Sequence, residues 1–401
     1  MSAIPYVLMG FMILTGSLNT IFQSLQYAEK SLEMPYRHAW VQSHNMFLGE
    51  LYCLIIYYIS RMYESYENTV GNNSESESEA SPSIFILVIP TACDLFATTL
   101  FAFSLLNMST SVYQMLRGGL MLVTSSLSVI FLDKNQYRHH ILGLAIVLIS
   151  IFLISLAGLL YGNHIEERTT NFEGIIMMLI GLIFRGFQFI TEEYIINHYD
   201  INPLKMVGYE GVWGASFYTL LLILLQNIRC EHFFGRDIFC SSNNHDEWRV
   251  EDTLFALKQM MHNELLFLYV AAGTFSIGFY NYYGVSVTLY ASSAQRAVVD
   301  NLRTIVVWVF FLSVPTSIKE EFIWLQLVGF VGMVIGTLIY NEILEISIWN
   351  FNKYTKINIL KEEQQELEEE KGRMKKINEN YSTIDDEEIE LKANTDNKKI
   401  I

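Results

Sequence analysis

The sequence predicts an all-α integral membrane protein with ten transmembrane helices. Of the 401 residues, 51% are hydrophobic and only 17% are charged, whereas a soluble domain carries about 25% charged residues. The charges crowd into a few short segments. Between these segments lie ten apolar windows that approach or exceed the roughly 20 residues needed to cross a bilayer. The windows are residues 4–24, 40–60, 84–106, 110–132, 139–161, 173–195, 205–227, 264–288, 292–314 and 323–344.

The first five windows and the last five are predicted to be two copies of one unit, residues 1–162 and 163–345. The pair Leu116-Arg117 in the fourth window is matched 186 residues later (116 to 302) by Leu302-Arg303 in the ninth, and Gly143 is matched by Gly329 at the same offset. Because five is odd, the second copy starts on the opposite side of the membrane. The copies are therefore expected to be inverted repeats, as in many secondary transporters. A chance match of these few residues is the alternative.

Three polar segments lie outside the windows. Residues 63–82 form an acidic linker too poor in apolar residues to pack, and it is predicted to be disordered. Residues 228–263 form a long loop, and residues 346–401 form a charged, largely disordered tail. Much of the net charge of −16 lies in the linker and the tail, which argues against nucleic-acid partners and a polybasic lipid-binding surface. The tail is either solvated or docks a partner protein.

The cysteine pattern indicates no metal site. Cys53 and Cys93 fall inside apolar windows and are expected to be small buried residues. Cys230 and Cys240 share the 228–263 loop and can form a disulfide if that loop faces an oxidising lumen. No cysteine has metal-ligand spacing, and His139-His140 is expected to be an interfacial pair. Neither a metal nor a cofactor is predicted.

Charged side chains inside the windows give the functional signal. A guanidinium group in hydrocarbon costs about 2.5–3.5 kcal/mol on insertion scales, so it survives where it faces a partner or a water-filled path. We expect Arg117 and Arg303, one from each half, to line a central site for an anion. Asp300 would hold Arg303 while that site is empty. Neutral hydrogen bonds would come from Gln114, Asn19 and Asn281. The alternative is that such pairs are fixed and only set helix register.

Three carboxylic acids inside the windows are candidates for proton coupling, namely Glu50, Asp94 and Glu192. A low-dielectric site favours the neutral form of a carboxyl group, which allows it to exchange a proton near neutral pH. Glu50 and Asp94 have no evident partner on their own helices, so a functional or cross-helix role is favoured for both.

Two further patterns limit the function classes. The sequence lacks the HExxH, GxSxG, GxGD and Walker motifs, so no enzyme is predicted. Gly332 and Gly336 form a GxxxG face that serves either a homodimer or packing within the chain.

Polar blocks in the windows carry a family resemblance. The most specific are Leu106-Asn-Met-Ser-Thr-Ser111 running into Gln114-Met-Leu-Arg-Gly118, and Val299-Asp-Asn-Leu-Arg-Thr304. Less specific blocks are Thr15-Gly-Ser-Leu-Asn-Thr20, Met46-Phe-Leu-Gly-Glu50, Cys93-Asp94, Glu192-Glu193, Glu210-Gly211, Ser286-Val-Thr288, Arg296, Gly336-Thr337 and Tyr340-Asn341. Together they cover about residues 4–344 in order. They resemble the drug/metabolite transporter superfamily and, within it, subfamily F of solute carrier family 35, the member-six type.

The resemblance implies two inverted five-helix repeats of the EamA type that work by alternating access, with both termini in the cytosol. It also implies an endomembrane location, in lysosomal or Golgi/ER membranes, with mitochondria as a further possibility. It does not supply the cargo.

The sequence therefore predicts a secondary transporter, similar to nucleotide-sugar transporters, for a small polar, anionic metabolite. The rival is a membrane adaptor that has kept a carrier fold and recruits partners through its tail or the 228–263 loop. A channel ranks third because the chain has no ring of like charges.

Overall fold

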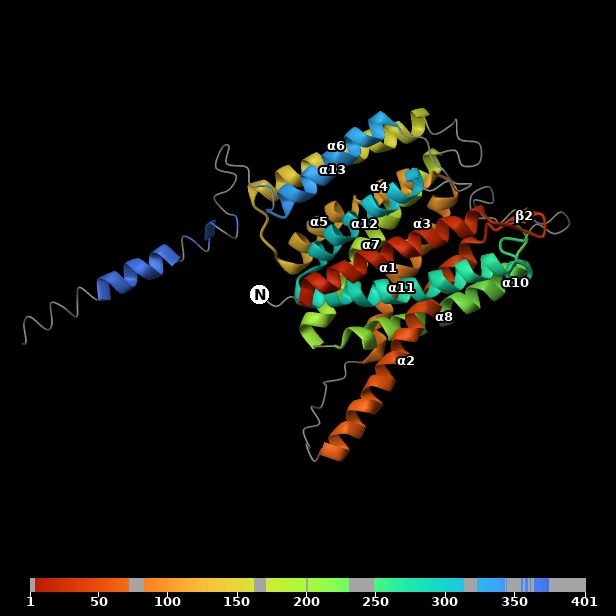
Figure 1. The fold of residues 1–401 in the computed structure, drawn as a ribbon, viewed down its shortest axis with the longest axis horizontal. Helices are drawn as coiled ribbons and strands as arrows, with labels where there is room; N and C mark the ends of the chain where they lie inside the picture. The colour runs from red at the N-terminus through yellow and green to blue at the C-terminus, as the bar shows by residue number, and fades with distance from the viewer. Residues whose placement is uncertain are drawn as a thin grey trace, which may run out of the picture.

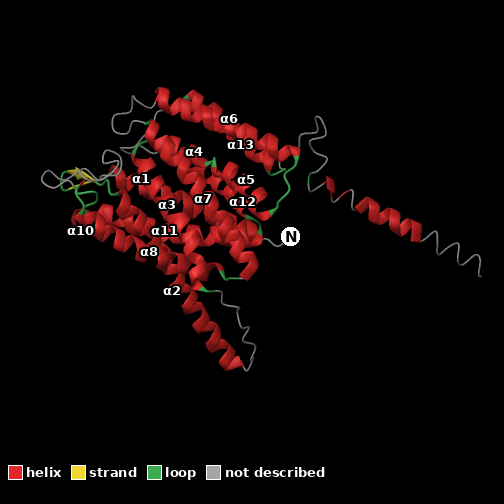
Figure 2. Cartoon of the chain, turned by 180° about the vertical axis from the view of Figure 1, so that it is seen from behind, coloured by secondary structure: helices red, strands yellow, loops and turns green. Residues whose placement is uncertain are grey.

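The computed structural model describes residues 4–71, 83–161, 171–199, 201–230, 249–313 and 323–342, together with residues 344, 355, 358–359, 361 and 364–374 of the tail; the side chains of 65–71 are not described. Almost all of this is helix (Figure 2). The helices are α1 (Ile4–Ala28), α2 (Ala39–Gly71), η1 (Ile84–Leu87), α3 (Val88–Leu106), α4 (Thr110–Arg117), α5 (Leu120–Leu132), α6 (Arg138–Tyr161), α7 (Phe172–Tyr199), α8 (Pro203–Asn227), α10 (Thr253–His262), α11 (Glu264–Tyr290), α12 (Ser293–Ser313) and α13 (Trp324–Tyr340).

Each of the ten predicted windows contains a helix. Seven helical segments of the described chain are long and apolar enough to cross a membrane: α1, η1–α3, α4–α5, α6, α7, α8 and α11. Helix α12 is not among them because it contains three charged residues, Arg296, Asp300 and Arg303, and α13 has only 17 residues. The chain is thus a multi-pass, all-α membrane protein, while the total of ten crossings stays a prediction.

Helix pairing follows a symmetric pattern in the bundle (Figure 1). The most extensive contacts join α1 to α11, α3 to α7, α2 to α8 and α6 to α13. If α4 and α5 count as one helix, then α1, α2, α3 and α6 of the first half correspond to α7, α8, α11 and α13 of the second. Exchanging the two halves then turns the pair α1–α11 into the pair α7–α3. The pairs α2–α8 and α6–α13 each join a helix to its own counterpart and stay the same. This pattern supports the predicted inverted repeat, which remains a prediction.

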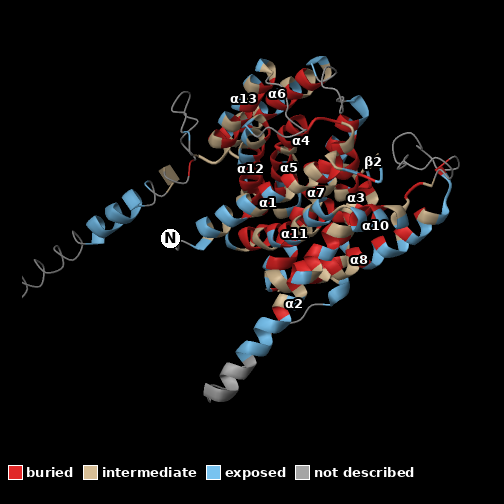
Figure 3. Cartoon of the chain, turned by 45° about the vertical axis from the view of Figure 1, so that its right-hand side comes forward, coloured by how far each residue is buried: buried red, intermediate tan, exposed pale blue. Residues whose placement is uncertain are grey.

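Buried residues lie on the inner faces of the helices and exposed residues on the outer faces (Figure 3). The buried set includes charged side chains and the exposed set includes large apolar ones, which is the arrangement that lipid favours. Arg296 and Arg303 are among the largest fully buried side chains, whereas Phe152, Ile130 and Leu220 are more than 60% exposed. A surface of this kind is stable in hydrocarbon and not in water.

The GxxxG face packs within the chain. A Cβ added to Gly336 would lie 2.8 Å from the backbone oxygen of Gly143, and one added to Gly332 would lie 2.5 Å from Ser150 Oγ. Both contacts are with α6, so the motif permits close approach of α13 and α6. The GxxxG face therefore serves packing within the chain. It gives no support to a homodimer, which stays a prediction.

A small cap closes the end of the bundle opposite the N-terminus (Figure 1). The antiparallel strands β1 (Lys30–Ser31) and β2 (Met34–Pro35) receive hydrogen bonds from Gln259 of α10, whose amide donates to the backbone oxygens of Ser31 at 2.9 Å and Met34 at 3.3 Å. Part of the predicted 228–263 loop is therefore ordered against the hairpin that joins α1 to α2.

Helix α2 also differs from its predicted extent. It continues to Gly71, past the start of the predicted linker at residue 63, while residues 72–82 lie outside the described residues. In the tail, which was predicted to be largely disordered, residues 364–374 are helical.

Candidate functional site

A break in a helix places the first arginine. Helix α4 ends at Arg117 and α5 begins at Leu120, so Gly118 and Gly119 separate them. A Cβ on Gly118 would lie 2.1 Å from Met333 Sδ, so glycine permits this approach of α13. The side-chain amide of Asn301 donates to the Gly118 oxygen at 3.3 Å and satisfies it. The break is a single tight turn, because Gly118 and Gly119 keep right-handed helical dihedrals and the backbone hydrogen bonds continue three residues apart. Such a turn within a helix often marks a functional hinge.

Asp300 joins the two predicted arginines. Its carboxylate lies 2.7 Å from Arg303 Nε and 3.6 Å from Arg117 Nη2, and it accepts a hydrogen bond from the Tyr280 hydroxyl at 2.6 Å. Arg303 Nη1 donates to the backbone oxygen of Gly16 at 3.1 Å. One carboxylate therefore faces two guanidinium groups, and this cluster carries a net positive charge.

The two arginines line a cavity, which we call the arginine cavity. Its volume is about 40 Å³, and its lining includes Asn19, Gln23, Gln42, Asn45, Thr98, Phe101, Tyr113, Arg117, Arg185, Ile277, Tyr280 and Arg303. The later turns of α1 and the first turns of α2 supply its polar rim, so it extends toward the β1–β2 end of the bundle. Arg117 is 11% exposed and Arg303 is 1% exposed.

The predicted binding residues are only partly brought together. Asn19 lines the arginine cavity with Arg117 and Arg303, and Asp300 lies between the two guanidinium groups. Gln114 and Asn281 are fully buried and do not line it. Sequence reasoning assigned no binding role to Tyr280 and Tyr113, because aromatic residues in apolar windows give no distinct signal.

The predicted coupling carboxylates divide into two kinds. Asp94 forms an ion pair with Arg185 at 2.9 Å, and Glu192 forms one with Arg296. The amide of Gln188 donates to both acids, at 2.8 Å and 2.6 Å. By contrast, Glu50 accepts a hydrogen bond from the Asn281 amide at 2.5 Å and has no cationic partner among the described residues.

Two acids outside the predicted set are also buried. Glu193, next to Glu192 on α7, is 3% exposed. It pairs with Lys134 and accepts hydrogen bonds from Ser293, at 3.2 Å from the backbone nitrogen and 2.5 Å from Oγ. Glu210 is 2% exposed and has no hydrogen bond or ion pair among the described residues. Two sequence signals could have identified it: Glu210 is an ionisable residue inside the window 205–227, and it belongs to the Glu210-Gly211 block.

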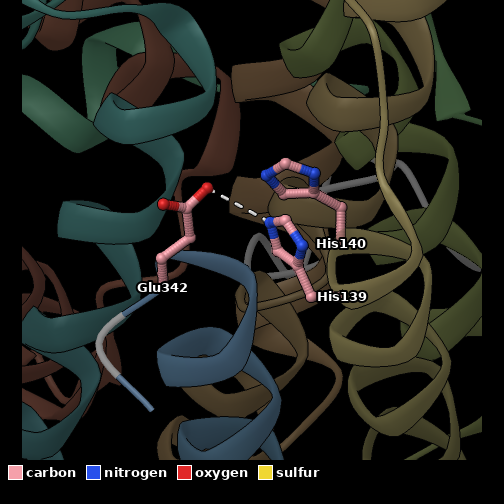
Figure 4. Close-up of side chains that lie close together, drawn as sticks. All are labelled: His139, His140 and Glu342. Atoms are coloured by element: carbon pink, nitrogen blue, oxygen red, sulfur yellow. Dashed lines mark hydrogen bonds and ion pairs between the residues drawn. The ribbon is translucent and has the colours of Figure 1, made fainter. Parts of the chain in front are cut away.

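His139, His140 and Glu342 gather where α6 begins and α13 ends (Figure 4). His139 Nε2 lies 3.2 Å from Glu342 Oε1, a distance that suits a hydrogen bond or two ligands of one metal. However, His140 Nδ1 accepts a hydrogen bond from the Tyr137 backbone at 3.1 Å. The proton of the neutral ring then lies on Nε2, so this ring has no lone pair left for a metal. The geometry favours the interfacial pair.

A second cavity of about 200 Å³ lies next to this cluster, at the N-terminal end of the bundle, between the end of α5 and the start of α12. Its lining includes Ser128, Lys134, Gln136, His140, Gln295 and Asn341.

The cysteines leave one prediction open. Cys230 is disulfide-bonded, and Cys53 and Cys93 are free thiols. Cys240 lies outside the described residues, so its pairing with Cys230 stays a prediction.

These features define a class, that of multi-pass membrane proteins with a polar, charged centre between apolar helices. No family model matches the chain. The protein Solute carrier family 35 member F6 of Mus musculus is 31% identical over 343 residues, which cover 83% of this chain and 87% of that protein. The Homo sapiens protein of that name is 30% identical over 344 residues, and an uncharacterised protein of Schizosaccharomyces pombe is 28% identical over 340 residues, 97% of its length. The chain therefore belongs to solute carrier family 35, subfamily F.

Proposed function

We propose that the protein is a secondary transporter that moves a small polar, anionic metabolite across an endomembrane by alternating access. The observation that carries this proposal is the arginine cavity, which Arg117 of the first half and Arg303 of the second half both line, together with Arg185, whose charge is paired with Asp94. Arginine matches carboxylate and phosphate oxygens in charge and geometry. A buried cluster with excess positive charge attracts an anion, because uncompensated buried charge is costly and the bound anion compensates it.

Asp300 acts as the internal counter-ion of the empty site. Its contact with Arg117 is 3.6 Å long, compared with 2.7 Å to Arg303. An incoming anion therefore replaces the weaker contact, with Arg117, first. Arg117 and Arg303 are then bound to the substrate, and Asn19 supplies a neutral hydrogen bond at the rim.

The closed state of the molecule supports alternating access. At about 40 Å³, the arginine cavity is far below the roughly 300–1,000 Å³ of ligand pockets, so the bundle must open to admit a metabolite. The seam between α7 and α12 at the N-terminal end is held by Glu192 with Arg296 and by Glu193 with Ser293. Release of these contacts would open the site toward the side of the termini, which we assign to the cytosol.

A proteoliposome counterflow screen tests this function. Liposomes that contain the purified protein are loaded with nucleotide sugars, nucleotides, amino acids or small carboxylates. Uptake of the labelled solute is then measured with and without a pH gradient. We expect exchange of one anionic class. Arg117→Ala and Arg303→Ala should each reduce its uptake by about 100-fold, because losing a contact to a charged group costs about 3 kcal/mol.

Arg61→Ala is the matched control, because Arg61 lies on the exposed surface of α2. It should leave uptake unchanged. Normal saturable uptake in both cavity variants would overturn the assignment of the site.

A further inference from the structure

Two buried carboxyl groups in the bundle lack a cation. Among the described residues, Arg185 pairs with Asp94, Arg296 with Glu192, and Arg117 and Arg303 with Asp300. Glu50 is 0% exposed and Glu210 is 2% exposed, and neither forms an ion pair with a described residue. An ionised carboxylate in such a place costs several kcal/mol, and a neutral carboxylic acid avoids that cost.

The helices at this point are packed too closely for a hydrated ion. A Cβ on Gly278 of α11 would lie 2.2 Å from the backbone oxygen of Gly49, and a Cβ on Gly211 of α8 would lie 2.8 Å from Glu50 Cβ. Helix α2 is thus held between α8 and α11, with Glu50 at the contact and Glu210 next to Gly211. Neither acid lines either of the two cavities.

Three oxygen atoms at this contact have no hydrogen-bond partner in the described part of the chain: Glu50 Oε2, Glu210 Oε1 and Asn281 Oδ1. The charged or titratable groups nearest to them are Cys53 on α2, Asp94 on α3, Arg185 and Glu192 on α7, and Arg296 on α12. Both nearby arginines already have a carboxylate. Neither arginine is therefore available to compensate Glu50 or Glu210, and a bound proton avoids the cost of an unpaired buried charge.

We propose that Glu50 and Glu210 form the proton-binding site that couples transport to a pH gradient. This inference rests on the proposed function and narrows its coupling residues, because Asp94 and Glu192 are held by arginines. A proton fits where a metal ion does not. It needs one oxygen atom, whereas Na⁺ or Ca²⁺ needs several oxygen ligands at more than 2 Å. The proton binds a carboxylate oxygen of the pair and leaves as hydronium, so no further reactant is required.

Helix α11 links this site to the arginines. Asn281 donates to Glu50, and its neighbour Tyr280 donates to Asp300. The cavity reaches Met46 and Ile277, which precede Glu50 and Asn281 by four residues, or about one helical turn. Loss of the proton would place charge beside Asn281, shift α11, and so alter the contact of Tyr280 with Asp300.

The test uses Glu50→Gln and Glu210→Gln in the full chain, with Glu64→Gln, an exposed position on α2, as the matched control. Glutamine keeps the shape of the neutral acid. Infrared difference spectra of the purified protein are recorded between mildly acidic and mildly alkaline pH. The wild type and Glu64→Gln should show a buried carboxylic acid band that titrates. Glu50→Gln and Glu210→Gln should each lose part of this band, and the variant that carries both substitutions should lose all of it.

Transport gives the second readout. Exchange without a pH gradient should persist in both variants within about two-fold of the wild type, whereas gradient-driven accumulation should fall by at least ten-fold. Unchanged spectra, or full gradient-driven accumulation in both variants, would overturn the proton site while the transporter remains. If the wild type moves no solute but the band titrates and is lost in the variants, the proton site stands and the proposed transport fails.

Discussion

At the scale of single residues, the proposed anion site depends on Asp300. It is 1% exposed and faces two guanidinium groups, and Nη2 of Arg303 has no hydrogen-bond acceptor among the described residues. One carboxylate therefore neutralises two charges incompletely. The charged Asp300 carboxylate stabilises both arginines, and removing it would leave Arg117 and Arg303 buried without a negative charge beside them.

Asp300→Asn keeps the shape of the side chain and removes its charge. We expect the variant to lose about 3–5 kcal/mol of stability, as for other broken buried pairs. The loss should be partly reversed by phosphate or chloride, because an anion at 100 times its Kd returns about 2.7 kcal/mol. Thermal unfolding in detergent, with and without each anion, measures both effects.

Glu192→Gln provides the matched comparison. It also leaves a buried guanidinium group, that of Arg296, without its carboxylate, but Arg296 does not line the arginine cavity. The variant should be destabilised to a similar degree and should not respond to anions. Equal rescue of the two variants would mean that the anions act on the protein in general and not at the site.

At the scale of helices, glycine contacts determine how closely the elements approach. The backbone oxygen of Gly49 occupies the place that a Cβ on Gly278 would take, at 2.2 Å. The backbone cannot yield as a long side chain does, so overpacking at this point should separate α2 from α11. The hydrogen bond between Glu50 and Asn281 lies at the same contact.

Gly278→Ala should therefore cost about 1–3 kcal/mol of stability and reduce transport. Gly10→Ala is its control on α1, because no atom lies within 4 Å of the added Cβ. That change should be neutral or raise stability by up to about 1 kcal/mol through helix propensity. Thermal unfolding of the two variants measures the change in stability. Equal changes in Gly278→Ala and Gly10→Ala would contradict the close contact of α2 and α11.

The sequence allows the helices to be predicted better than their interruptions. Apolar length and charge distribution predict the windows, because lipid requires both. The break after Arg117 was not predicted, although Gly118 and Gly119 mark it, since two glycines within a long apolar run are also compatible with a continuous helix. The corresponding point of the second half, at Thr304, lies within unbroken α12, so the repeat offset gave no warning of the break.

At the scale of the whole molecule, the sequence allowed an ion pair within one helix to be predicted, but not the partners of ion pairs that join two helices. The pairing of Asp300 with Arg303 follows from their spacing on α12. The cross-helix partners, such as Asp94 with Arg185, depend on which helix faces come together, and a single sequence does not determine that. Glu210 was missed for this reason, because its lack of a cation is a property of the assembled bundle.

The two cavities lie toward opposite ends of the bundle, and the contacts between them define which end is closed. Lys134, Glu193 and Ser293 form a latch that joins the α5–α6 loop, α7 and α12 at the N-terminal end. Hydrogen bonds to a charged group contribute about 1.5–3 kcal/mol each. Removal of the Glu193 carboxylate should therefore shift the balance of the two end-open states by ten-fold or more toward opening at the latch.

Thiol labelling measures this shift. Cys53 and Cys93 are replaced by alanine, and a single cysteine is placed at Asn45 in the rim of the arginine cavity or at Gln295 in the second cavity. In the presence of Glu193→Ala, we expect a membrane-impermeant maleimide to react several-fold faster with Gln295→Cys and more slowly with Asn45→Cys. Glu264→Ala, at the start of α11 and remote from the latch, should change neither rate. If both rates rise together, Glu193 only stabilises the fold, because a shift between two alternating states must close one end as it opens the other.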